Sequence, residues 1–300
     1  MIYYLLVAST AILYSLAFYF NRNIEENSKT CIDTTVIFTT VTWTEILVIL
    51  TVVAKGELAV TPFSAIIAAL HALFIILCAF MTLKAMGVAD LGQYSLYMML
   101  GGMLVPFFFG IVFWNEKITV GKIICCIIVT CALIADSMIG KEKAKNSSRR
   151  AFIYLIAVFL INGSFGVFVT VHQTSEAYNR VGTLQYMILE AAFISTFGIL
   201  FLLSRIIISR AKKQKFSTPI RGKKTYLYML GYGLLYGGGE LILLFAIAHI
   251  DASVQYPLVS GGTIACSAII SMLIGENKNK KVLIPVLISI IGMMCLLLPV

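Results

Sequence analysis

The chain has 300 residues, of which 60% are hydrophobic and only 12% are charged. A soluble domain is closer to half apolar and a quarter charged, so this composition excludes an ordinary water-soluble protein. The net charge of +9 would suit a protein that binds nucleic acid. The basic residues, however, lie between apolar runs, where the preference of membrane proteins for cytoplasmic Lys and Arg explains them. We therefore expect a lipid bilayer as a partner and no nucleic acid.

Ten apolar runs follow one another along the chain, and each is long enough to cross a membrane as a helix. They fall at residues 2–20, 33–54, 62–83, 88–113, 118–139, 151–172, 183–208, 225–249, 252–274 and 282–299. Lipid offers no hydrogen bonds to the backbone, so runs of this kind must be helical. The sequence predicts an all-α integral membrane protein with ten transmembrane helices.

The second and third runs each carry an ionisable residue near their middle, Glu45 and His71. Charge deep in lipid is costly, and such residues are usually functional or paired. In an antiparallel hairpin of these two runs the two side chains reach a similar depth. One interpretation is a polar site in which Glu45 binds a proton or a cationic group and His71 tunes it. The other is a structural pair in which each residue satisfies its neighbour.

The sixth and seventh runs carry Asn162 and Glu190, and they follow a basic stretch at residues 141–150 that we interpret as a cytoplasmic linker. The Asn162 amide suits either substrate binding or a hydrogen bond to a neighbouring helix. Glu190 corresponds in position to Glu45, or is a carboxylate that reaches the surface from near a helix end.

The eighth run is the richest in polar and aromatic residues. Tyr228, Tyr232, Tyr236 and Glu240 are spaced four apart, which stacks them along one helix face. Aromatic faces attract cations, so Tyr232, Tyr236 and Glu240 favour a cavity, whereas Tyr228 suits the membrane interface. Glycine allows close helix approach or local unwinding, and the same run contains several: Gly231, Gly233, Gly237, Gly238 and Gly239.

The basic residues also indicate the orientation of the helices. Most of the 23 Lys and Arg lie in the gaps that follow odd-numbered runs. The rule that cytoplasmic loops are rich in Lys and Arg then places these gaps in the cytoplasm. We expect a plasma-membrane protein with both termini outside.

The chain contains a weak internal repeat. The matching features of the first copy are Ala85-Met86-Gly87, Asp90, Gln93-Tyr94, Gly101-Gly102 and Asn115-Glu116-Lys117. Those of the second copy are Ala246-Ile247-Ala248, Asp251, Gln255-Tyr256, Gly261-Gly262 and Gly275-Glu276-Asn277. We therefore expect two five-helix repeats, at residues 1–140 and 151–300. An odd number of helices per repeat inverts the second copy, an arrangement typical of secondary transporters.

The stretches Trp114-Asn115-Glu116-Lys117-Ile118-Thr119 and Ile274-Gly275-Glu276-Asn277 resemble the EamA-type branch of the drug/metabolite transporter superfamily. Pro257 lies where that family often has proline, whereas the first half has Ser95 there and Pro106 later. The resemblance implies a ten-helix secondary transporter. Small multidrug-resistance relatives carry a glutamate in their first helix, but Leu13-Tyr14-Ser15-Leu16 has no acid, so that coupling mechanism is not carried over.

Motifs for ATP hydrolysis, serine hydrolysis or zinc binding are absent from the sequence, so we expect no enzyme, metal or cofactor. The function we expect is secondary transport of a small metabolite, with a cationic or zwitterionic amine or amino acid favoured, by alternating access coupled to protons or to exchange. The alternative is a membrane-embedded enzyme or a channel that uses Glu45 and His71. The expected substrate-binding residues are Glu45, His71, Asn162, Glu190, Tyr232, Tyr236 and Glu240.

Overall fold

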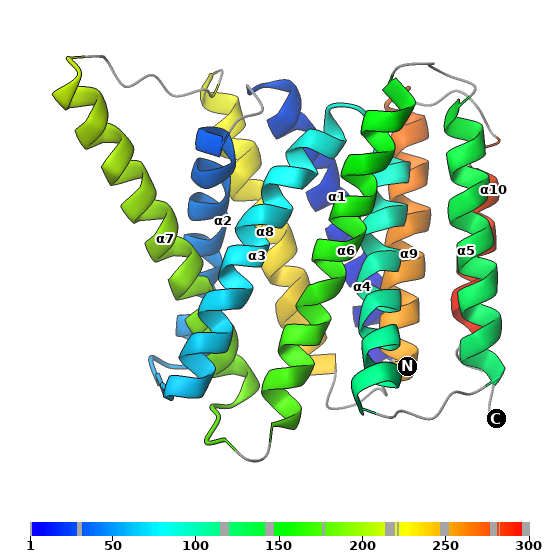
Figure 1. The fold of residues 1–300 in the computed structure, drawn as a ribbon, viewed down its shortest axis with the longest axis horizontal. Helices are drawn as coiled ribbons and strands as arrows, with labels where there is room; N and C mark the ends of the chain where they lie inside the picture. Colours follow the sequence, from blue (N-terminus) through cyan, green and yellow to red (C-terminus); the bar gives the residue numbers. More distant parts are fainter. Residues whose placement is uncertain are drawn as a thin grey trace.

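Ten α-helices make up nearly all of the part of the chain that the structure, a computed structural model, describes. That part comprises residues 2–28, 32–114, 120–141, 147–175, 178–213, 220, 222–246, 252–276, 281 and 283–295. The helices are α1 (Ile2–Glu26), α2 (Ile32–Val53), α3 (Pro62–Met86), α4 (Leu91–Trp114), α5 (Val120–Lys141), α6 (Ser147–Thr174), α7 (Thr183–Ala211), α8 (Lys223–Ala246), α9 (Ala252–Leu273) and α10 (Leu283–Met294). They alternate in direction (Figure 1). Within the described residues there is no strand, only a single bridge between Ser28 and Ile220. The predicted all-α class is confirmed.

The described helices fit a membrane-embedded protein. Six of them, α1 to α4, α6 and α7, are long and apolar enough to cross a membrane, and shorter apolar stretches lie in α5, α9 and α10. Large hydrophobic side chains cover the outside of the bundle, among them Val52, Leu227 and Leu273, which are 72%, 67% and 80% exposed. A surface of this kind is stable against lipid rather than water.

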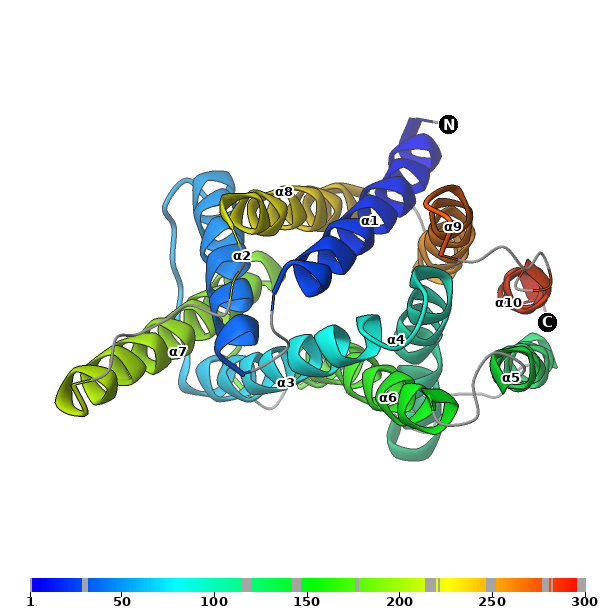
Figure 2. The ribbon, with the colours of Figure 1, turned by 90° about the horizontal axis from the view of Figure 1, so that it is seen from above.

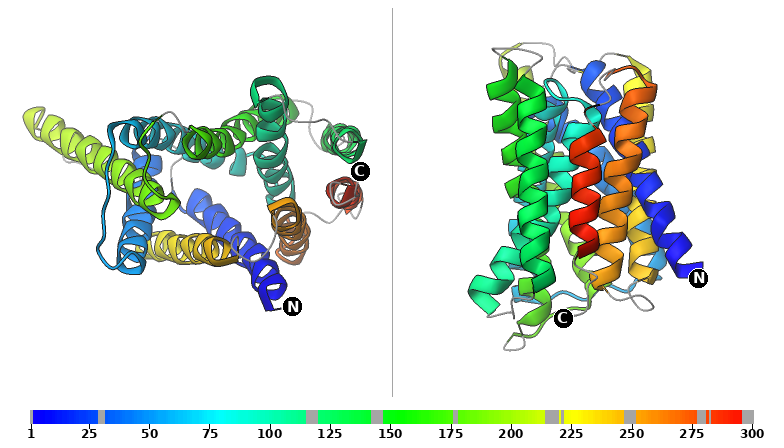
Figure 3. Two further views of the ribbon diagram at one scale, coloured as in Figure 1. Left: turned by 90° about the horizontal axis from the view of Figure 1, so that it is seen from below. Right: turned by 90° about the vertical axis from the view of Figure 1, so that its right-hand side faces the viewer.

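The helices pack in pairs that join distant parts of the sequence. Helix α1 lies between α8 and α9, and α6 lies between α3 and α4. Helix α2 packs against α7 and α8, α4 packs against α9, and α5 and α10 stand together at one edge (Figures 2 and 3). Small residues permit the closest of these contacts. A Cβ atom at Gly101 of α4 would overlap the backbone of Phe159 in α6.

A carboxylate after α9 holds the start of α4 in place. Glu276 accepts hydrogen bonds from the backbone N–H of Leu91 at 2.9 Å and from the Ser271 hydroxyl at 3.0 Å. Its other oxygen forms an ion pair with Arg22 of α1 at 2.7 Å. Because the first turn of a helix leaves its N–H groups without backbone partners, this carboxylate stabilises α4 as well as joining three helices. The matching Glu116 lies outside the described residues.

Candidate functional site

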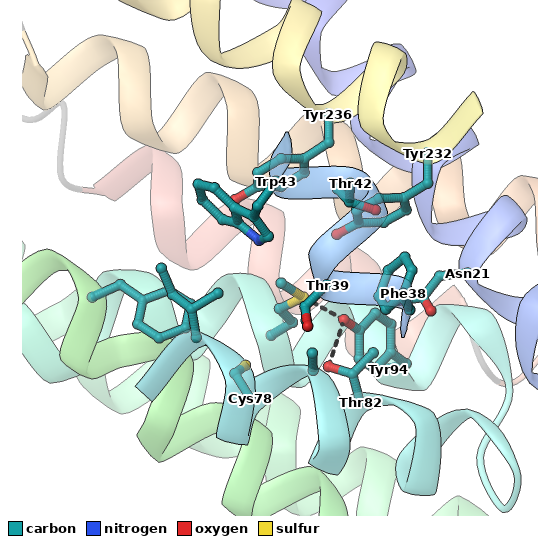
Figure 4. A pocket seen from close by; sticks show the side chains of 14 residues that line it. Asn21, Phe38, Thr39, Thr42, Trp43, Cys78, Thr82, Tyr94, Tyr232 and Tyr236 are labelled. Atoms are coloured by element: carbon teal, nitrogen blue, oxygen red, sulfur yellow. Dashed lines mark hydrogen bonds between the residues drawn. The ribbon is translucent and has the colours of Figure 1, made fainter. Parts of the chain in front are cut away.

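A buried cavity lies among α1, α2, α3, α4, α6 and α8. Its volume is about 50 Å³, on a measure in which one water molecule needs about 10–15 Å³. The cavity therefore has room for a few water molecules. Six aromatic side chains form much of its wall (Figure 4): Phe38, Trp43, Tyr94, Phe165, Tyr232 and Tyr236.

Hydroxyl groups and soft side chains complete the wall. Thr39 and Thr42 come from α2, and Cys78 and Thr82 come from α3. The Tyr94 hydroxyl donates to the Met98 sulfur at 2.6 Å and lies 3.2 Å from the Thr82 hydroxyl. These hydrogen bonds fix the Tyr94 ring, because a buried hydroxyl with two partners has little freedom to turn. A ligand in this cavity would meet aromatic faces and hydroxyls rather than a charged group.

A stack of tyrosine rings forms one side of the cavity, and a carboxylate lies behind it. Tyr236 stacks on Tyr232 with ring centres 5.6 Å apart and on Tyr14 of α1 with centres 5.1 Å apart. The Tyr14 hydroxyl donates to Glu240 at 2.8 Å. A phenol that donates to a carboxylate gains electron density on its ring, which strengthens the attraction of that ring for a cation. The predicted alignment of Tyr232, Tyr236 and Glu240 on one face of α8 thus places the two rings at the cavity and the acid behind them.

Helix α8 is helical throughout its described length, so its glycines do not unwind it. They instead permit close approach of α1 and α2. A Cβ atom at Gly231 would overlap the ring of Phe20. One at Gly239 would lie 2.6 Å from the Tyr14 ring, whereas one at Gly238 would meet nothing within 4 Å. Of the two roles predicted for these glycines, close packing is therefore the one observed.

We expect Gly239→Ala to destabilise the protein by about 1–3 kcal/mol, the usual cost of overpacking. The added methyl displaces the Tyr14 ring, which is only 5% exposed and stacks on Tyr236. The neighbouring substitution Gly238→Ala is the matched control and should leave stability unchanged, because its methyl group has open space. Thermal unfolding of both variants in detergent tests this. Equal melting temperatures would contradict the proposed contact.

His71 and Glu190 form a buried pair outside the cavity wall. The His71 Nδ1 atom lies 3.3 Å from a Glu190 carboxylate oxygen and 3.2 Å from the Tyr186 hydroxyl. Their side chains are only 4% and 7% exposed. The structure thus brings together two residues that the sequence singled out separately, from α3 and α7. It shows Glu190 to be buried rather than reaching the surface.

Glu45 does not join this pair. One of its carboxylate oxygens is buried without a hydrogen-bond partner among the described residues. It lies against Gly233 of α8, where an added Cβ atom would overlap the carboxylate. The pairing of Glu45 with His71 expected from the α2–α3 hairpin is therefore corrected. Similar depth does not imply contact, because Glu45 turns toward α8 and His71 turns toward α6 and α7.

Of the two roles predicted for Asn162, the structure shows the hydrogen bond to a neighbouring helix. Its Nδ2 group donates to the backbone carbonyl of Met98 in α4 at 2.8 Å. An added Cβ atom at Gly102, one turn further along α4, would lie 3.1 Å from the same nitrogen. The side chain therefore joins α6 to α4 and is not among the residues that line the cavity.

Several residues of the two sites were not predicted. Tyr14 lies in α1, where only the lack of an acid was noted, and Trp43 lies two residues before Glu45. Tyr186 precedes Glu190 by one helical turn, which is the spacing that could have indicated it. His172, whose ring nitrogen lies 2.9 Å from the Ser64 hydroxyl, carries no local signal because this partner is more than one hundred residues away in the sequence.

Comparisons with known proteins show the fold and nothing more specific. No family model matches the sequence, and no curated protein matches it. A solved structure described as "Crystal structure of protein" is similar to 98% of this chain over 96% of its own length, with 13% identity and a TM-score of 0.61. The likeness therefore extends over nearly the whole helical arrangement.

Proposed function

We propose that this protein is a secondary transporter that moves a small cationic or zwitterionic amine or amino acid across the plasma membrane. The observation that carries the proposal is the aromatic cavity among helices from both halves of the chain. Aromatic rings hold an ammonium group through cation–π attraction without a fixed counter-charge. The Glu240 carboxylate behind Tyr14 adds negative potential near that wall.

The pattern of helix packing supports two inverted five-helix repeats, at residues 1–140 and 151–300. Each helix has a counterpart in the other repeat, five positions away in chain order. When each helix is replaced by its counterpart, the pair α1–α8 becomes α6–α3, α1–α9 becomes α6–α4, and α2–α8 becomes α7–α3. All of these pairs are in contact. Gly102 of α4 and Gly262 of α9, which occupy matching positions in the repeat, also face α6 and α1, at Asn162 and at Ala11. Inverted repeats let the two halves exchange roles as a central site opens to either side.

The size of the cavity supports alternating access. With room for only a few water molecules, it must widen before it accepts an amine or amino acid. A channel would need a continuous open path, which a cavity of this size does not provide. The enzyme alternative relied on Glu45 acting with His71, and these residues face different helices. The resemblance to the EamA-type branch of the drug/metabolite transporter superfamily agrees with this proposal.

The orientation follows from the basic residues at one end of the bundle. The end of α7 and the start of α8 carry Arg205, Arg210, Lys212, Lys213, Lys223 and Lys224. They lie at the upper end in Figure 1, where α1 also ends. From the tendency of Lys and Arg to stay inside, we infer that this end faces the cytoplasm and that both chain termini are outside.

Counterflow in proteoliposomes tests the proposal. We expect uptake of at least one labelled solute from a panel of amines, amino acids and neutral metabolites to saturate, and to accelerate when the vesicles contain the same unlabelled solute. Empty liposomes are the control. A channel would give flux that internal solute does not accelerate, and an enzyme would release a product. Either result would refute the transporter.

A further inference from the structure

A series of polar side chains leads from the lower end of the bundle to the buried His71–Glu190 pair. At the lower end, the Ser64 hydroxyl accepts a hydrogen bond from the Val181 backbone N–H at 3.1 Å and lies 2.9 Å from His172 Nε2. The His172 ring stacks on Tyr186 with ring centres 4.2 Å apart. The Tyr186 hydroxyl in turn lies 3.2 Å from His71 Nδ1. Titratable groups therefore follow one another from the α6–α7 connection to the buried His71–Glu190 pair.

This pair can take up and release one proton, and its net charge changes each time it does so. A neutral histidine beside an ionised Glu190 gives the pair a net charge of −1 in a site that is almost fully buried. One added proton makes the pair neutral overall, either as imidazolium with carboxylate or as imidazole with carboxylic acid. Because an uncompensated charge is costly in low dielectric, the two protonation states respond strongly to a charge placed nearby.

The histidine rings also have unused positions for a proton. The His71 Nε2 atom and the His172 Nδ1 atom are buried and have no hydrogen-bond partner in the described part of the chain. Among the described residues these two ring nitrogens are therefore free to accept a proton or a new contact.

A single aromatic side chain connects the pair to the cavity. The Phe165 ring lines the cavity and lies 5.1 Å from the His71 ring, centre to centre. A ligand that moves Phe165 would therefore disturb His71 directly. Both sites share α3 and α6, so a change in one alters the packing of the other.

We propose that the His71–Glu190 pair is the site that binds the coupling proton, with Tyr186 as its hydrogen-bonded neighbour. This inference rests on the proposed transport function and assigns the pair a role separate from substrate binding. Exchange of substrate for substrate then needs only the cavity, whereas accumulation driven by a pH gradient needs the pair.

Other titratable groups surround the pair and must be considered in its response to pH. They are His172 of α6, Tyr186 of α7, Arg180 before α7, and Tyr236 and Glu240 of α8. Glu240 interacts electrostatically with Glu190, and Arg180 with His172. Of these groups only Tyr186 contacts His71 by a hydrogen bond, so we expect Glu190 to dominate proton binding at this site.

Infrared difference spectroscopy between acid and alkaline pH tests proton binding without any ligand. We expect the purified protein to show a carbonyl band of protonated carboxylic acid, with one component that is missing in Glu190→Gln. The matched control is Glu57→Gln, an exposed carboxylate in the connection before α3, which should keep that component. Retention of every component in Glu190→Gln would overturn the assignment, whether or not the protein proves to be a transporter.

Proteoliposomes test the coupling itself, with labelled tetramethylammonium as the probe. We expect the rate of tetramethylammonium exchange in Glu190→Gln to stay within about twofold of that of the unaltered protein. Its uptake driven by a pH gradient should fall at least tenfold. Loss of exchange to the same extent would overturn the separation of proton site and substrate site. Unchanged response to the gradient would also overturn it.

A second variant keeps the proposal testable if Glu190→Gln does not fold. His71→Gln leaves the carboxylate but removes the ring that shares its proton. We expect a shifted Glu190 carbonyl component and the same selective loss of gradient-driven uptake. An unshifted component, together with unchanged coupling, would show that the pair does not bind the coupling proton.

Discussion

Tyr236→Ala is expected to weaken the binding of a cationic ligand by roughly thirtyfold. The Tyr236 ring lines the cavity and stacks between Tyr14 and Tyr232. A desolvated cation–π contact contributes about 2 kcal/mol, and every 1.4 kcal/mol is about tenfold in affinity. Tyr236→Phe keeps the ring and loses only the hydroxyl, so we expect about a threefold change or less. Calorimetric titration with tetramethylammonium measures both.

Two controls separate cation recognition from simple loss of packing. The neutral analogue tert-butanol has a similar shape but no charge, so in Tyr236→Ala its affinity should fall much less than that of tetramethylammonium. Tyr228→Ala removes a ring two turns away on the same helix, where Tyr228 packs against Phe20 and does not line the cavity. Its affinity for tetramethylammonium should stay unchanged. Equal losses in Tyr236→Ala and Tyr236→Phe would refute a cation–π role.

Local sequence patterns predicted the helices well because apolar runs of this length are typical of membrane-spanning helices. Each apolar run corresponds to one helix, and the run at residues 62–83 lies within α3, which begins at Pro62 and ends at Met86. Pro62 suits a first helical position, and the Thr61 side chain before it accepts a hydrogen bond from the Ser64 N–H. Signals of this kind depend only on neighbours in the sequence, so no knowledge of tertiary contacts is needed to find them.

The spacing along α8 predicted one part of the candidate site. Residues four apart share a helix face whatever surrounds the helix, and Tyr232, Tyr236 and Glu240 do line up in this way. The sequence could not show what faces them. Tyr14 contributes the third ring of the stack and the hydrogen bond to Glu240, and it comes from a helix more than two hundred residues earlier in the chain.

The partners of buried charges were the least predictable feature. Glu45 and His71 lie in adjacent helices, and a hairpin argument uses adjacency alone. The structure has α3 packed on α6 and α7, so His71 meets Glu190 and Tyr186 instead. Which helices become neighbours is decided by the long-range packing of small residues, not by the order of the chain.

Gly101→Ala tests that long-range packing and should have the largest effect on stability of the substitutions considered. Its added Cβ atom would overlap the backbone of Phe159, and a backbone cannot turn aside as a side chain can. We expect a loss of stability at or above the upper end of the range of about 1–3 kcal/mol for overpacking. Thermal unfolding and gel filtration in detergent measure the folded fraction.

Gly102→Ala is the matched control at the next position. Its Cβ atom would lie 3.1 Å from the Asn162 amide nitrogen alone, which a small side-chain shift accommodates. We expect its stability to stay near that of the unaltered protein. Similar melting temperatures for the two variants would mean that α4 and α6 are not in contact at Gly101. Because Tyr94, Met98 and Phe165 on these two helices line the cavity, Gly101→Ala should also lower ligand affinity in whatever protein remains folded. Unaltered affinity in that fraction would show that the cavity does not depend on this helix contact.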